Sequence, residues 1–136
     1  MHSDNPLHAN ARSPAILQAS LQAGIQTATD YPNIHRQFII GGASIYKEAL
    51  QLPSSPSRTS VDRILLTRVL SPSFEDCDVF MPEFRDLKSE KGSLLWERAE
   101  HNDLEEWVGG EVPSGVQEEN GVKYEFQMWT RAINEN

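Results

Sequence analysis

A strand, turn and helix pattern in Phe38–Leu50 constrains this chain more than any other feature. Phe38–Ile40 is an apolar run that predicts the end of a buried strand, and Ala43–Leu50 has the spacing of a helix. Gly41 and Gly42 stand between them and carry no side chains. A bare turn lets the backbone approach a ligand, and the free N–H groups of a first helical turn point at negative charge. The pattern therefore permits a nucleotide-phosphate site, although a tight turn without a ligand is the commoner use of one Gly-Gly pair.

The usual dinucleotide fingerprint, G-x-G-x-x-G, is absent from this turn. The residues after Gly42 are Ala43, Ser44, Ile45 and Tyr46, so no third glycine follows. The segment is not a plain Rossmann motif.

The second half of the chain predicts further strands. Ile64–Leu70 is nearly all apolar, which is expected of a strand buried on both faces, and Leu94–Ala99 predicts a short strand. Asn120-Gly121 predicts a type I′ hairpin turn. The alternation in Val122–Met128 then predicts one buried face and one wetter face, with Trp129 on the wetter one.

Two helices and a disordered lead complete the prediction. Met1–Arg12 lacks periodicity and predicts disorder, so residues 13–136 form the expected domain. Ser13 is the expected N-cap of a helix that begins at Pro14 and ends at Asp30–Pro32. A second helix is expected to begin with a capping box of Asn102 and Glu105 and to end at the glycines that follow Val108.

The charge balance excludes some partners. The chain has 20 acidic and 12 basic residues, a net charge of −8. Such a surface repels nucleic acid and anionic membranes, so we expect neither partner. No apolar run approaches the roughly 20 residues of a membrane span, and the start lacks a signal-peptide pattern.

The single cysteine, Cys77, rules out an internal disulfide and fits a reducing compartment. We expect a cytoplasmic protein, with mitochondrial or nuclear pools open. Cys77 is interpreted as a small filler beside Asp76 and Asp78 rather than a reactive thiol. Those acids and Glu75 are interpreted as a solvated turn, so no metal is expected.

Four segments, in order, resemble the C-terminal portion of the dihydrofolate reductase family. They are Phe38–Leu50, Arg63–Leu70, Phe74–Pro82 and Val116–Trp129. Trp96–Gly110 is more similar to the fungal members than to the animal ones.

The resemblance implies an α/β fold with part of the reductase sheet. Flanking helices and a C-terminal antiparallel hairpin are expected, which makes the sheet mixed. Phe38–Ile40 and Ile64–Leu70 are predicted to be parallel, with Ala43–Leu50 as their crossover helix and the hairpin at the edge. The family also implies a cis peptide between Gly41 and Gly42.

The resemblance further implies the NADPH-dependent reduction of dihydrofolate to tetrahydrofolate, a step of one-carbon metabolism. Ile40 would offer its backbone carbonyl to the pterin amine, Thr67 would contact the pterin through water, and Tyr46 would lie near the nicotinamide. The cofactor-binding residues implied by the family are Gly41, Gly42, Ala43, Ser44, Ile45 and Tyr46.

The family's first strand, its mobile loop and its acid-bearing helix have no match in Met1–Ala11. The catalytic proton donor is therefore unknown, since neither Asp30 nor Glu48 matches a motif, and the residues for the 2′-phosphate are not identified. We expect a truncated reductase with negligible turnover alone. The alternative is a non-catalytic remnant that acts at most as a nucleotide-binding or interaction module. Self-association through an exposed sheet edge is expected in either case.

Overall fold

The computed structural model describes residues 15–52 and 61–132. Their contacts divide the chain into two compact units, with the boundary between Gln37 and Phe38, and each unit is described by itself. The expected disordered lead, Met1–Arg12, lies outside the described residues, as does Ser13.

The first unit contains one described helix, α2, which spans Leu21–Asp30. Its N-cap is Ser20, whose hydroxyl oxygen accepts a hydrogen bond from the Ala23 amide at 3.1 Å. The predicted start, Pro14, also lies outside the described residues, but residues 15–20 are not helical, so α2 begins later than predicted. The predicted end is confirmed, since Tyr31 is the C-cap and has left the helical conformation.

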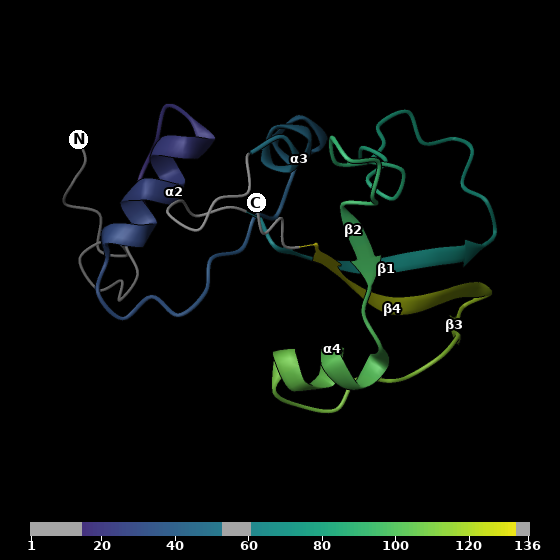
Figure 1. Cartoon of the computed structure of the whole chain (residues 1–136). Helices are drawn as coiled ribbons and strands as arrows, with labels where there is room; N and C mark the ends of the chain where they lie inside the picture. The colour runs from purple at the N-terminus through teal and green to yellow at the C-terminus, as the bar shows by residue number, and fades with distance from the viewer. Residues whose placement is uncertain (1–14, 53–60, 133–136) are drawn as a thin grey trace, which may run out of the picture. The chain divides into compact units, whose positions relative to one another are not determined.

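The second unit is built on an antiparallel sheet with β4 at its centre (Figure 1). β1 pairs with one side of β4, while β2 and β3 pair with the other side. The strands are β1 (Arg63–Ser71), β2 (Trp96–Arg98), β3 (Gln117–Glu119) and β4 (Val122–Arg131). The α/β class, the flanking helices and the short strand around Trp96 are thus confirmed.

The predicted parallel pair is wrong. Phe38–Ile40 is irregular, and the side chains of Phe38 and Ile40 are 62% and 89% exposed. No strand of the described residues lies beside this segment to exchange hydrogen bonds with it. β1 pairs with β4 instead, in an antiparallel register that sets Ile64 opposite Trp129. The helix between the two segments is confirmed as α3, Ala43–Leu50.

The hairpin between β3 and β4 has the predicted turn. Asn120 and Gly121 have φ of 52° and 81°, the two positive values that a type I′ turn requires. Glu119 and Val122 face each other across this turn. The hairpin includes the central strand of the sheet rather than lying wholly at its edge, because β4 pairs on both sides.

One face of β4 carries a tryptophan-rich core, although it was predicted to be the wetter face. The core cluster consists of Leu50, Ile64, Phe84 and Trp96, and the half-buried Trp129 packs against it. Gln127 lies on the same face and is only 5% exposed. Its side-chain amide donates to Glu125 Oε1 at 2.6 Å, and its Oε1 accepts from the Trp129 indole at 2.9 Å. These bonds explain how a polar residue is buried there.

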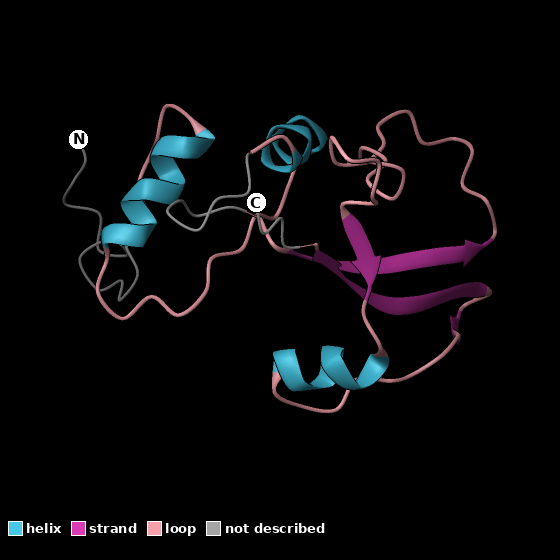
Figure 2. Ribbon diagram, viewed as in Figure 1, coloured by secondary structure: helices cyan, strands magenta, loops and turns pink. Residues whose placement is uncertain are grey.

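The long loop between β1 and β2 is drawn in pink in Figure 2. It contains Phe84, which belongs to this core. The rings of Phe84 and Trp129 pack edge to face with their centres 5.2 Å apart. Cys77, in the same loop, is exposed, so its interpretation as a packed filler is wrong.

The other face of β4 is covered in part by α4, which spans His101–Val108 (Figure 1). Met128 is 3% exposed on this face, and Leu104 of α4 is 5% exposed. Leu65 and Val69 of β1 remain 46% exposed, so the prediction that this strand is buried on both faces is wrong. The covering helix packs against β4 and leaves these β1 side chains open.

The start of α4 differs from the predicted capping box. The N-cap is Glu100 without a side-chain cap bond, and Asn102 lies inside the helix. The Glu105 carboxylate instead accepts a hydrogen bond from the amide of Val112 at 2.9 Å. The predicted end is confirmed, because Gly109 closes the helix in the left-handed conformation.

Candidate functional site

The predicted phosphate site is a glycine turn that leads directly into α3. Gly41 has φ of +115°, and the Gly41–Gly42 peptide is cis, as the resemblance implied. Gly42 is the N-cap of α3, with an extended backbone. The first helical hydrogen bond runs from the Tyr46 amide to the Gly42 carbonyl at 2.9 Å.

The first amides of α3 face an open approach. Ala43, Ser44 and Ile45 precede the first donor of the helical ladder, so their N–H groups have no acceptor within the helix. Within the described residues, no side-chain hydrogen bond caps this helix end, and Gly42 is exposed. A Cβ built on Gly42 would meet no atom within 4 Å, so the space over the turn is free. Open amides at a helix start form an arrangement that binds anions.

Tyr46 closes one side of the turn. Its hydroxyl oxygen lies 3.7 Å from the place that a Cβ on Gly41 would occupy, which is ordinary van der Waals contact. The ring is half-buried, whereas Ser44 is exposed. The six residues assigned to the cofactor are therefore held together as one turn and helix start. The uncapped amides and the open space over Gly42 are features that a phosphate group would require.

The two residues assigned to the substrate are less closely joined to this turn. Ile40 directly precedes the glycines and is strongly exposed. Thr67 lies on β1 opposite Phe126 and is also exposed. In the described part of the chain, no hydrogen bond links Thr67 to Ile40 or to the glycine turn.

The described residues include no buried carboxylate, because Gln127 is their one buried polar side chain. Asp30 is exposed and accepts a hydrogen bond from the Gln26 amide at 3.1 Å, and Glu48 is exposed on α3. Neither has the burial that is typical of a carboxylic acid acting as a proton donor. Across residues 15–52 and 61–132, no cluster of three or more metal-ligating side chains occurs.

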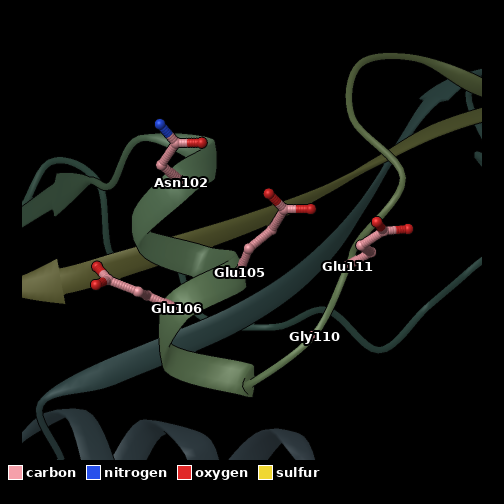
Figure 3. A pocket seen from close by; sticks show the side chains of 5 residues that line it. All are labelled: Asn102, Glu105, Glu106, Gly110 and Glu111. Atoms are coloured by element: carbon pink, nitrogen blue, oxygen red, sulfur yellow. The ribbon is translucent and has the colours of Figure 1, made fainter.

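A shallow hollow of about 600 Å³ lies on α4 and the loop after it (Figure 3). It is acidic, and its lining residues are Asn102, Glu105, Glu106, Gly110 and Glu111. Its carboxylates would repel a phosphate group, and none of the cofactor residues lines it. The hypothesis of a nucleotide-phosphate site therefore depends on the glycine turn and not on this hollow.

Arg131 is the last residue of β4 and belongs to none of the motifs in the sequence. Its guanidinium Nη1 donates a hydrogen bond to the carbonyl of Leu52, just beyond the end of α3, at 3.2 Å. The two residues are 79 positions apart. No local pattern in the sequence could have indicated this contact.

Comparison with known proteins gives a consistent result. A dihydrofolate reductase of Pneumocystis carinii is 44% identical over 101 residues, which are 74% of this chain and 44% of that protein. One from Cryptococcus neoformans is 39% identical over 124 residues, 81% of this chain and 52% of that protein. The pig enzyme, also a dihydrofolate reductase, is 38% identical over 94 residues, 69% of this chain and 39% of that protein.

The chain thus spans about half the length, or less, of these curated relatives. No protein-family model matches it. Within the described residues, no helix is long and apolar enough to cross a membrane.

Proposed function

We propose that this chain, which belongs to the dihydrofolate reductase family, provides the NADPH-binding turn of an enzyme that reduces dihydrofolate to tetrahydrofolate. Family membership follows from the fungal relatives at 39–44% identity over most of the chain. The reaction, the substrate and the cofactor are proposals, since the chain spans about half of those proteins. Residues 13–136 would form the C-terminal portion of the reductase domain.

The observation that carries the proposal is the uncapped start of α3 behind the glycine turn. The amides of Ala43–Ile45 would bind the cofactor diphosphate, and the missing side chain of Gly42 would let it approach. The net charge of −8 does not favour an anionic ligand, so the binding would depend on these local amide dipoles.

The remaining residues would orient the two reactants. Tyr46 would border the nicotinamide, the backbone carbonyl of Ile40 would accept a hydrogen bond from the pterin amine, and Thr67 would contact the pterin through water. When bound, NADPH supplies the hydride, while the chain aligns donor and acceptor. The proton donor is not assigned to any residue of this chain.

NADPH binding tests the proposal. The purified chain is titrated with NADPH, and binding is followed by calorimetry. We expect Gly42→Ala to weaken the affinity about tenfold, because the new methyl group fills the approach to the amides. Gly110→Ala is the matched control, since a Cβ there also meets no atom within 4 Å and the residue follows α4 rather than preceding α3.

Absence of NADPH binding by the unmodified chain would overturn the proposal. Equal affinities of the Gly42→Ala and Gly110→Ala variants would remove the turn from the site. Steady oxidation of NADPH in the presence of dihydrofolate would identify a complete reductase. Binding without turnover would favour the alternative, a nucleotide-binding module without catalysis.

Two further features belong to the same proposal. β1 pairs only with β4 among the described strands and exposes Leu65 and Val69, which favours association with a second copy through its free edge. Analytical ultracentrifugation over a concentration series checks this association. The single cysteine favours a reducing compartment such as the cytoplasm.

A further inference from the structure

The helix that presents the glycine turn is attached to the fold at its far end. No other described helix or strand brings a Cα atom within 8 Å of a Cα atom of α3. Its last two residues, Ala49 and Leu50, are buried, and Leu50 belongs to the tryptophan-rich core. Leu52, two positions later, is 8% exposed. The C-terminal end of α3 is therefore the end that packs against the rest of the unit.

Backbone hydrogen bonds hold Arg131 beside this end of α3. Its amide donates to the Asp62 carbonyl at 3.0 Å, and the next amide, that of Ala132, donates to the Leu95 carbonyl at 2.8 Å. The end of β4 is thus tied to the chain on both sides. The register of the sheet also sets Arg131 opposite Trp96, and its guanidinium carbon lies 5.9 Å from the centre of the Trp96 ring.

The side chain of Arg131 joins the end of β4 to the end of α3. Its Nη1 donates to the Leu52 carbonyl at 3.2 Å. Partial burial lowers the pKa of Arg131, but a guanidinium remains charged in proteins. A cation beside the last carbonyls of a helix is favourable, because the helix dipole places negative partial charge there. Among the described hydrogen bonds, this one alone links α3 or the residue that follows its C-cap to a strand.

We infer that Arg131 is a positioning residue for the glycine turn. The inference rests on the proposed function for its ligand, NADPH. The eight residues of α3 separate its packed C-terminal end from the glycine turn by about 12 Å, at 1.5 Å per residue. Arg131 therefore does not touch a ligand bound at the turn. The orientation of the helix at its C-terminal end therefore contributes to where the amides of Ala43–Ile45 point.

A looser helix lowers affinity without removing any ligand contact. If α3 holds the binding orientation for only a fraction of the time, the apparent dissociation constant rises by the inverse of that fraction. The packing of Leu50 remains in an Arg131 variant, so the helix stays folded and only its orientation is freed. We therefore expect a loss of affinity of about threefold to tenfold.

The test compares two arginines on the same face of the sheet. Arg131→Met removes the donor but keeps an apolar stem against Trp96, and Arg131→Lys retains a charged donor. Arg98→Met is the control, since Arg98 forms an ion pair with Glu125 at 3.5 Å on β4 and does not contact α3. NADPH affinity is measured for each, together with amide hydrogen exchange along α3 and along β1 and β4.

The expected result is weaker NADPH binding and faster exchange in α3 for Arg131→Met, with unchanged exchange in the strands. Arg131→Lys should restore most of the affinity, and Arg98→Met should match the unmodified chain. Arg131→Gln, which keeps a polar end but is shorter, replaces the Met variant if that variant does not fold.

Unchanged exchange in α3 would overturn the inference, and so would unchanged affinity in a chain that binds NADPH. Faster exchange throughout the sheet would also overturn it, since Arg131 would then stabilise the whole unit. If the unmodified chain does not bind NADPH, the proposed function fails separately. The exchange measurement still decides whether Arg131 holds α3.

Discussion

The chain contains two Gly-Gly pairs beside helices, and they have opposite roles. Gly41-Gly42 precedes α3 and leaves the first amides of that helix without a cap. Gly109-Gly110 follows α4, and both of its amides donate to the Glu105 carbonyl, at 2.9 and 3.2 Å. One pair exposes backbone donors, whereas the other uses its donors to satisfy the end of a helix.

The difference lies in the backbone and in the end of the helix that each pair adjoins. Gly109 has φ of 81° and ψ of 28°, a common left-handed conformation for a helix end. Gly41 has φ of +115°, which lies outside the small left-handed region open to other residues. Identical dipeptides thus become a candidate binding element in one place and a structural stop in the other.

Gly41→Ala should have the largest effect on stability. Alanine cannot adopt φ of +115° without strain, so we expect the free energy of unfolding to fall by about 1–3 kcal/mol. Chemical denaturation followed by circular dichroism measures the loss. A loss of unfolding free energy smaller than that of Gly109→Ala would show that the turn tolerates a side chain. The two Gly-Gly pairs would then not differ in their backbone requirements.

Gly109→Ala should have a smaller effect, a loss of about 1 kcal/mol, because the left-handed region is unfavourable for alanine but open to it. Gly110→Ala is its control. A Cβ at Gly110 meets no atom within 4 Å, and its φ lies outside the restricted range, so its unfolding free energy should stay within about 0.5 kcal/mol. Equal losses in the two variants would contradict the assignment of Gly109 as the stop.

Gly42→Ser should have the smallest effect on stability and should change stability and binding in opposite directions. Gly42 has the extended backbone of an N-cap, so a serine hydroxyl there can accept from a first-turn amide and stabilise α3 by a few tenths of a kcal/mol. The same bond occupies a donor that the cofactor would use. Thermal unfolding and NADPH titration measure the two effects, and a rise in both would show that the amides do not bind the ligand.

The local parts of the fold were predictable from the sequence. The Asn120-Gly121 turn, the helix at Ala43–Leu50 and the stop at Gly109 each depend on backbone preferences of a few neighbouring residues. The turn at Gly41-Gly42 was also predicted, since the family resemblance and the conformational freedom of glycine indicate the same two residues. None of these features depends on contacts with residues that are distant in the sequence.

The failed predictions concern contacts, near or far along the chain, that the residue pattern alone does not specify. The alternation along β4 placed Gln127 on the wetter face, whereas its hydrogen bonds with Glu125 and Trp129 allow this side chain to be buried. The strand predicted at Phe38–Ile40 is absent because its residues have no strand beside them in the described structure. The helix starts were misplaced since several nearby residues can cap a helix, and the cap of α2 is Ser20.

The antiparallel pairing of β1 with β4 has a consequence for the order in which this unit folds. β3 and β4 are joined by a two-residue turn, so their hairpin can form early and locally. β1 meets β4 only after a loop of roughly fifty residues closes, which carries a larger entropic cost. The tryptophan-rich core needs Ile64 opposite Trp129, so it can assemble only after that closure. The most buried side chains of the unit are therefore among the last to be protected from water.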